Sequence, residues 1–135
     1  MAKNFIAPIP KRWSDPVIKL LEEGDPATIE WTFTALNERL LLGFHSEDMA
    51  YKHCIKTLRT PNLMGECVVD MRTKSHQKRC EAWAFLCPHP LNSPTPLFAK
   101  IGLHEDQLNI DLFSLHIDRK GDLQQRIEDH LNKKR

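Results

Sequence analysis

The sequence predicts an α+β fold, in which N-terminal helices pack on a roughly four-stranded antiparallel sheet and a further helix is added at the C-terminus. Two observations predict it. Apolar residues recur at helical spacing through the first 60 residues, and after Pro61 the pattern changes to short runs rich in β-branched and aromatic residues. The 135 residues, 41% hydrophobic and 27% charged, suffice for a single domain spanning 1–135 with its own core.

Three helices are predicted before Pro61. Capping residues followed by proline open the first over residues 14–24 and the second over residues 25–43, and a glycine ends each of them. Ser46 caps the third, which runs toward Pro61. The second helix carries an apolar stripe at three- and four-residue spacing, which we expect to face the core: Ile29, Phe33, Leu36 and Leu40.

Four strands are predicted after Pro61. They span residues 66–71, 80–87, 97–103 and 108–117. Strict alternation in the last strand places Leu112, Ser114 and His116 on one face and Phe113 and Leu115 on the other. We expect one face of this sheet to carry the helices and the other to be free to bind.

A C-terminal helix is predicted from Gly121-Asp122 onward, with Leu123, Ile127 and Leu131 at four-residue spacing. An isolated helix of this length is marginal in water, so we expect its apolar stripe to dock. The stripe either covers the sheet or the first helix of the same chain, or it contacts a second molecule.

The most concentrated charge is the basic segment 72–79, RTKSHQKR, which holds four cations and no carboxylate in a chain of formal net charge +1. Such a segment indicates a local anion site, and phosphodiester is the commonest large anion in a cell. A solvated basic loop is the alternative. Arginine forks and mobile lysines suit phosphate oxygens, so the candidates for RNA contact here are Arg72, Lys74, Lys78 and Arg79.

The sequence gives no sign of a membrane segment, a metal site or a cofactor. The start, MAKNFIAPIPKRW, is too proline-rich for a signal peptide, so a cytoplasmic location is expected. The four cysteines form no C-x-x-C pair, and structural zinc prefers such tight ligand pairs. We therefore expect reduced thiols and no bound metal.

An ordered set of segments runs in register from about residue 14 to residue 118: ALNERLLLGF at 35–44, the third helix with Asp48, Ile55 and Leu58, FAKI at 98–101, and Ser114-Leu115-His116. This set resembles the MqsR family of toxins from bacterial toxin–antitoxin modules, small ribonucleases of the RelE-like fold. The resemblance implies a metal-independent endoribonuclease that cleaves single-stranded mRNA and is neutralised by a cognate antitoxin protein. It leaves a homodimer open.

Three polar groups of that family are replaced in this chain. The lysine that follows the third helix has no counterpart in residues 63–66, the tyrosine of the family's Y-x-K-I motif is Phe98, and the lysine of the terminal strand is His116. Either neighbouring residues have rebuilt the chemistry, or the chain is a non-catalytic regulator that binds RNA or protein on the same scaffold. Of the two, we expect the ribonuclease.

Metal-independent RNA cleavage needs a base for the 2′-hydroxyl, a cation for the developing phosphorane charge and an acid for the leaving oxygen. His116 is the leading candidate for proton transfer, because imidazole serves either role at neutral pH. His76, inside the basic segment, and Glu81 are further acid–base candidates. Lys100 matches a family lysine, and its alternative is a salt bridge to Glu81.

Aromatic residues on the predicted strands are candidates for reading RNA. Phe98 and Trp83 are expected to stack an unpaired base, which is how single-stranded RNA is usually bound. For Trp83, packing in the core is the alternative.

Overall fold

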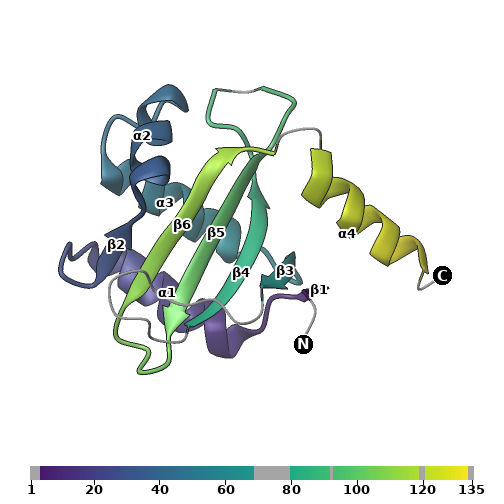
Figure 1. Cartoon of the computed structure of the whole chain (residues 1–135), viewed down its shortest axis with the longest axis horizontal. Helices are drawn as coiled ribbons and strands as arrows, with labels where there is room; N and C mark the ends of the chain where they lie inside the picture. Colours follow the sequence, from purple (N-terminus) through teal and green to yellow (C-terminus); the bar gives the residue numbers. More distant parts are fainter. Residues whose placement is uncertain (1–3, 69–79, 92, 119–120, 134–135) are drawn as a thin grey trace.

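The computed structural model describes residues 4–68, 80–91, 93–118 and 121–133, and its helices and strands are shown in Figure 1. The first half of the chain holds β1 (Phe5–Pro8), α1 (Lys11–Glu23), β2 (Ile29–Trp31), α2 (Phe33–Leu41) and α3 (Glu47–Leu58). The second half holds β3 (Met64–Val68), β4 (Cys80–Cys87), β5 (Leu97–His104), β6 (Ile110–Ile117) and α4 (Asp122–Lys133). The protein is a mixed α/β fold, as the sequence predicts.

Six strands form one sheet in the order β1-β3-β4-β5-β6-β2. Neighbouring strands are antiparallel except at one edge, where β2 pairs parallel with β6. The central strands β4 and β5 pair along their whole length, from Cys80 opposite His104 to Cys87 opposite Leu97. The predicted four strands are therefore present, and two short edge strands, β1 and β2, are added to them.

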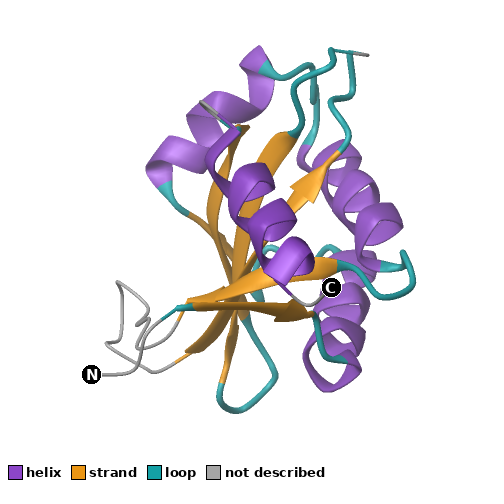
Figure 2. Ribbon diagram, turned by 90° about the vertical axis from the view of Figure 1, so that its right-hand side faces the viewer, coloured by secondary structure: helices purple, strands orange, loops and turns teal. Residues whose placement is uncertain are grey.

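Helices α1 and α3 pack against each other on one side of the sheet, which we call the covered face (Figure 2). Alternate side chains of the central strands point toward them, as the two-residue period of a strand requires. The core formed there includes Trp13, Val17 and Leu21 from α1, Tyr51, Cys54 and Ile55 from α3, Trp83 and Phe85 from β4, and Leu97, Ala99 and Ile101 from β5.

The segment 25–43, expected to be one long helix, instead contains a turn, a strand and a shorter helix. Asp25 closes the turn by accepting a hydrogen bond from the Ala27 amide through its side chain, at 2.9 Å. The chain then pairs with β6, and the Thr32 side chain accepts a bond from the Ala35 amide to cap α2. The single-helix prediction is wrong because the turn and β2 occupy residues 25–31.

The orientation of α2 also differs from the prediction. Ala35 is the buried residue of this helix, whereas Phe33, Leu36 and Leu40 of the expected core stripe are exposed. The stripe exists in the sequence, but the parallel pairing of β2 with β6 turns it away from the core.

One irregularity in β6 decides which residues share a face. The register of β5 against β6 shifts after Lys100, which leaves Phe113 as the extra residue of a β-bulge. Leu112 and Leu115 are consequently both buried in the core although they are three residues apart. The predicted alternation is wrong at this point, because the bulge moves His116 to the face opposite Leu112.

Helix α4 lies on the other side of the sheet, which we call the open face. Glu66 alternates with the core residue Cys67, so its side chain points away from the covered face, and its carboxylate pairs with Arg126 of α4. Asp118 caps α4 by accepting hydrogen bonds from two backbone amides of its first turn. Leu123 is wholly buried beneath the helix, so the C-terminal helix docks within its own chain.

Candidate functional site

A cluster of polar and aromatic side chains lies on the open face where β5 and β6 pair. Phe98 lies opposite His116 and Lys100 lies opposite Ser114. All of these side chains remain partly exposed, because the intervening residues of both strands fill the core. We call this set the β5–β6 cluster: Phe98, Lys100, Phe113, Ser114 and His116.

The imidazole of His116 is held in one orientation. Its Nδ1 lies 2.7 Å from the backbone oxygen of Ile117, and a carbonyl oxygen only accepts, so Nδ1 carries the hydrogen. The ring stacks on Phe98 with centroids 5.1 Å apart and planes inclined by 12°. In the neutral ring the lone pair is then on Nε2, which suits a general base.

Lys100 supplies a cation beside this histidine. Its Nζ lies 5.9 Å from the centre of the Phe113 ring, a cation–π contact that the bulge creates by adding Phe113 to this face. Lys100 has no ion pair with any residue that the structure describes. Its charge is therefore available to an anion.

The carboxylate of Glu66, two strands from Lys100, is neutralised by α4. Glu66 lies opposite Ala84, and Ala84 lies opposite Lys100, so two strand spacings, about 10 Å, separate the acid from the lysine. Arg126 pairs with Glu66, whose side chain is 10% exposed. The pair reduces the repulsion that a bare carboxylate would exert on phosphate.

Glu81 and Trp83 lie on the covered face, away from the β5–β6 cluster. Arg12 binds both carboxylate oxygens of Glu81, at 2.6 and 3.1 Å, and Trp83 Nε1 donates to the same group at 2.9 Å. Burial raises the pKa of Glu81, but these hydrogen bonds and the charge of Arg12 outweigh it and lower the pKa overall. Glu81 is thus a paired anion, and the alternative salt bridge to Lys100 does not form.

Trp83 follows the structural alternative rather than the RNA-binding prediction. Its ring is 2% exposed and packs in the core, with Phe5 edge-on at 5.9 Å. A base cannot stack on it without unfolding this part of the sheet. Phe98 is the predicted stacking residue that the structure places on the open face.

The basic segment lies outside the described residues. This applies to the predicted phosphate contacts Arg72, Lys74, Lys78 and Arg79 and to the acid–base candidate His76. Their roles stay predictions.

Two further titratable side chains on the open face, His104 and Asp111, are buried and contact each other. His104 Nε2 lies 3.1 Å from Asp111 Oδ1, and both side chains are 5% exposed. Cys80 lies opposite His104, and burial together with the charge of Asp111 raises the pKa of its thiol to about 11. The thiol is therefore protonated at neutral pH and is a poor nucleophile.

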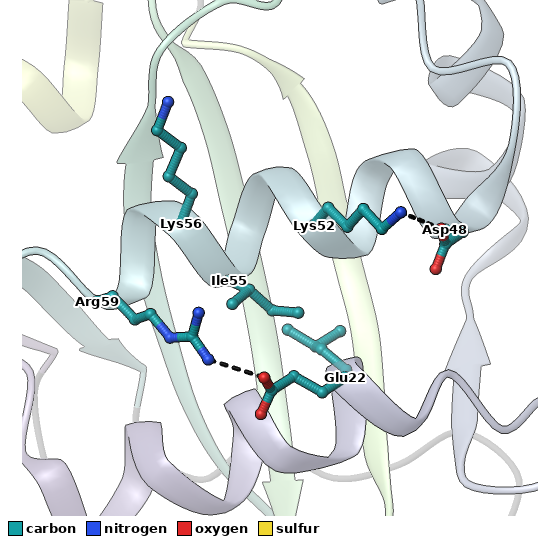
Figure 3. Close-up of a pocket in the computed structure, with 7 residues that line it drawn as sticks. Glu22, Asp48, Lys52, Ile55, Lys56 and Arg59 are labelled. Carbon is teal, nitrogen blue, oxygen red and sulfur yellow. Dashed lines mark hydrogen bonds and ion pairs between the residues drawn. The ribbon is translucent and has the colours of Figure 1, made fainter.

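A groove of about 510 Å³ runs between α1 and α3, on the helical side of the molecule (Figure 3). Four of its charged side chains form ion pairs, Arg59 with Glu22 at 2.7 Å and Lys52 with Asp48 at 3.1 Å. These exposed pairs cross-link neighbouring turns and helices, and Lys56 is a groove side chain without an ion pair to a described residue.

Sequence reasoning missed Phe113, Glu66 and Arg126 as neighbours of the site. The bulge that brings in Phe113 depends on pairing with β5, and Glu66 meets Arg126 across 60 residues of chain. No local pattern in the sequence signals these three contacts.

Comparisons with family models, with curated proteins and with solved structures found no match to this chain. Among the described residues, no helix has the length and apolarity needed to cross a membrane. The same residues contain no group of three histidine, cysteine or acidic side chains placed to hold a metal ion.

Proposed function

We propose that the protein is a metal-independent endoribonuclease toxin that cleaves single-stranded mRNA on the β5–β6 cluster. The observation that carries the proposal is a histidine and a lysine on one open sheet face. Among the described residues, nothing hydrogen-bonds the histidine at Nε2 and nothing forms an ion pair with the lysine. Together they supply a proton acceptor and a phosphate-binding cation, the two groups that 2′-hydroxyl attack requires first.

In this mechanism His116 Nε2 removes the proton from the 2′-hydroxyl, which attacks the adjacent phosphorus. Lys100 stabilises the negative charge that develops on the phosphate oxygens. The O5′–phosphorus bond breaks, and the departing oxygen takes a proton from solvent. The products are a 2′,3′-cyclic phosphate and a 5′-hydroxyl, so no metal-bound water is needed.

The aromatic side chain of Phe98 is the reason to expect that the substrate is unpaired RNA. Phe98 is partly exposed beside His116, so a base splayed out of a single strand can stack near the reacting phosphate. A duplex keeps its bases stacked inside and cannot offer one. By the family resemblance, a cognate antitoxin protein would neutralise the toxin.

The test is to incubate the purified protein with a long single-stranded RNA in the presence of a chelator. We expect discrete cleavage products, and His116→Ala should lower the rate by about 10²-fold or more. His45→Ala is the matched control, because His45 is an exposed histidine before α3. Full activity in a folded His116→Ala protein would contradict the assignment.

Binding without cleavage would instead support the non-catalytic regulator. The missing family lysine and the Phe98 substitution would then explain the lost chemistry. In that case Lys100→Met should weaken RNA binding, whereas His116→Ala should change it little.

A further inference from the structure

The outer face of α2 is apolar and has no described segment over it. In Figure 1 this helix lies at the β6–β2 edge of the sheet. Leu91, from the loop after β4, lies against its C-terminal end, since a Cβ at Gly43 would meet its Cδ2 at 3.0 Å. The α2 patch comprises five side chains with these exposed fractions: Phe33 80%, Leu36 36%, Leu40 59%, Leu41 78% and Leu91 63%.

The size of this patch calls for an explanation. Its side chains expose on the order of 600 Å² of apolar surface, which is at the upper end for a monomeric protein. A nine-residue helix that buries only Ala35 gains little from its own chain. Leaving three large stripe residues in water is a cost that a partner would relieve.

We propose that the α2 patch is the interface of a homodimer, in which two copies pair their α2 helices antiparallel about a two-fold axis. Phe33 and Leu40 are equidistant from the midpoint between Leu36 and Asn37, and Leu36 lies next to that midpoint. An antiparallel pair therefore sets Phe33 of one copy against Leu40 of the other, and Leu36 against its own copy. Such self-complementarity is what an isologous interface needs.

Charge and area both favour a second copy over a charged partner. The only charged residues of α2 are Glu38 and Arg39, so two copies of the helix do not repel each other. Arg39 is turned back on its own chain, where Nη1 donates to the Phe44 oxygen at 3.1 Å. Two patches would bury roughly 1,200 Å², which is the lower limit of specific interfaces.

Sedimentation equilibrium of the full chain tests the proposal. The weight-average mass should rise from 15.7 kDa at about 1 μM toward twice that value at about 200 μM. Phe33→Glu should remain at the monomer mass throughout, because it places a charge against apolar Leu40. Leu108→Glu is the matched control, since Leu108 is 65% exposed on the β5–β6 turn, and should dimerise like the unmodified chain.

A cross-linking experiment tests the antiparallel geometry with the patch intact. Asn37→Cys places a thiol beside the proposed axis, and mild oxidation should yield a disulfide-linked dimer. Gln124→Cys, an exposed position on α4, should not cross-link, and the four native cysteines are buried. A monomer at all concentrations, a dimer that survives Phe33→Glu, or equal cross-linking at both positions would overturn the proposal.

Discussion

The two faces of the sheet differ in how they treat polar groups. On the covered face the polar side chain of Glu81 is tied by Arg12 and Trp83, and its neighbours are packed apolar residues. On the open face Lys100, Ser114 and His116 stay partly exposed, and Lys100 has no ion pair with a described residue. The polar group on the covered face is tied into the packing, whereas the β5–β6 cluster of the open face keeps polar groups that are not.

The largest difference is expected between two phenylalanine substitutions on neighbouring strands, in the free energy of unfolding that each one removes. Phe85→Ala removes a ring that is 0% exposed on the covered face, so the free energy of unfolding should fall by about 3–5 kcal/mol. Phe98→Ala, on the open face, should cost about 1 kcal/mol. Urea denaturation measures both. Equal losses would mean that the open face is as tightly packed as the covered one.

Substituting one lysine on each side of the sheet should separate effects on activity from effects on stability. Lys100→Met should reduce RNA cleavage by about 10²-fold, equivalent to about 2.7 kcal/mol of transition-state stabilisation, and leave the unfolding free energy nearly unchanged. Lys56→Met, in the groove between α1 and α3, is the control and should retain full activity. If both variants cleave equally, Lys100 is not part of the site.

A buried and an exposed leucine of the α4 apolar stripe together test the docking of α4 on the open face. Leu123→Ala should lower the unfolding free energy by about 2 kcal/mol, because Leu123 is 0% exposed. Leu131→Ala should stay within about 0.5 kcal/mol, since the same stripe is 45% exposed there. Thermal melts of both variants measure this, and similar shifts would show that the whole helix packs equally.

The smallest expected effect is a pH-dependent one on the covered face. Because the pKa of Glu81 is lowered in the folded state, its ion pair contributes stability above the ordinary glutamate pKa of about 4.3, and this contribution is lost as pH falls through the lowered value. Glu81→Gln should therefore cost at most about 1 kcal/mol at pH 7, since Arg12 is largely exposed. A difference that persists unchanged at pH 3 would contradict the assigned ionisation.

Local signals in the sequence were enough for the long central elements. The predicted strand 80–87 coincides with β4, and the predicted cap Ser46 opens α3. Both elements have strong local cues, an aromatic run bounded by proline in one case and a capping side chain with an acidic first turn in the other. The pairing of β4 with β5 then follows from adjacency along the chain.

The short edge strands had no comparable signal. β1 has four residues and β2 three, and each is stabilised by pairing with a strand far away in the sequence. The apolar residues around β2 also fit a helical period, so the stripe through Phe33 and Leu40 predicted a core face that does not exist. Whether these segments form strands depends on the strands they pair with. A local sequence pattern does not contain that information.

The sequence by itself determined the chemistry available to this protein: a lysine and a histidine on the last two long strands, an aromatic residue beside them, and a helix to follow. Only the tertiary structure decided that they share a face. The bulge at Phe113 inverts the alternation of β6 and sets His116 beside Lys100, while Glu81 and Trp83 turn to the covered face. The physical reason is that strand alternation has a period of two, so one extra residue moves every later side chain across the sheet.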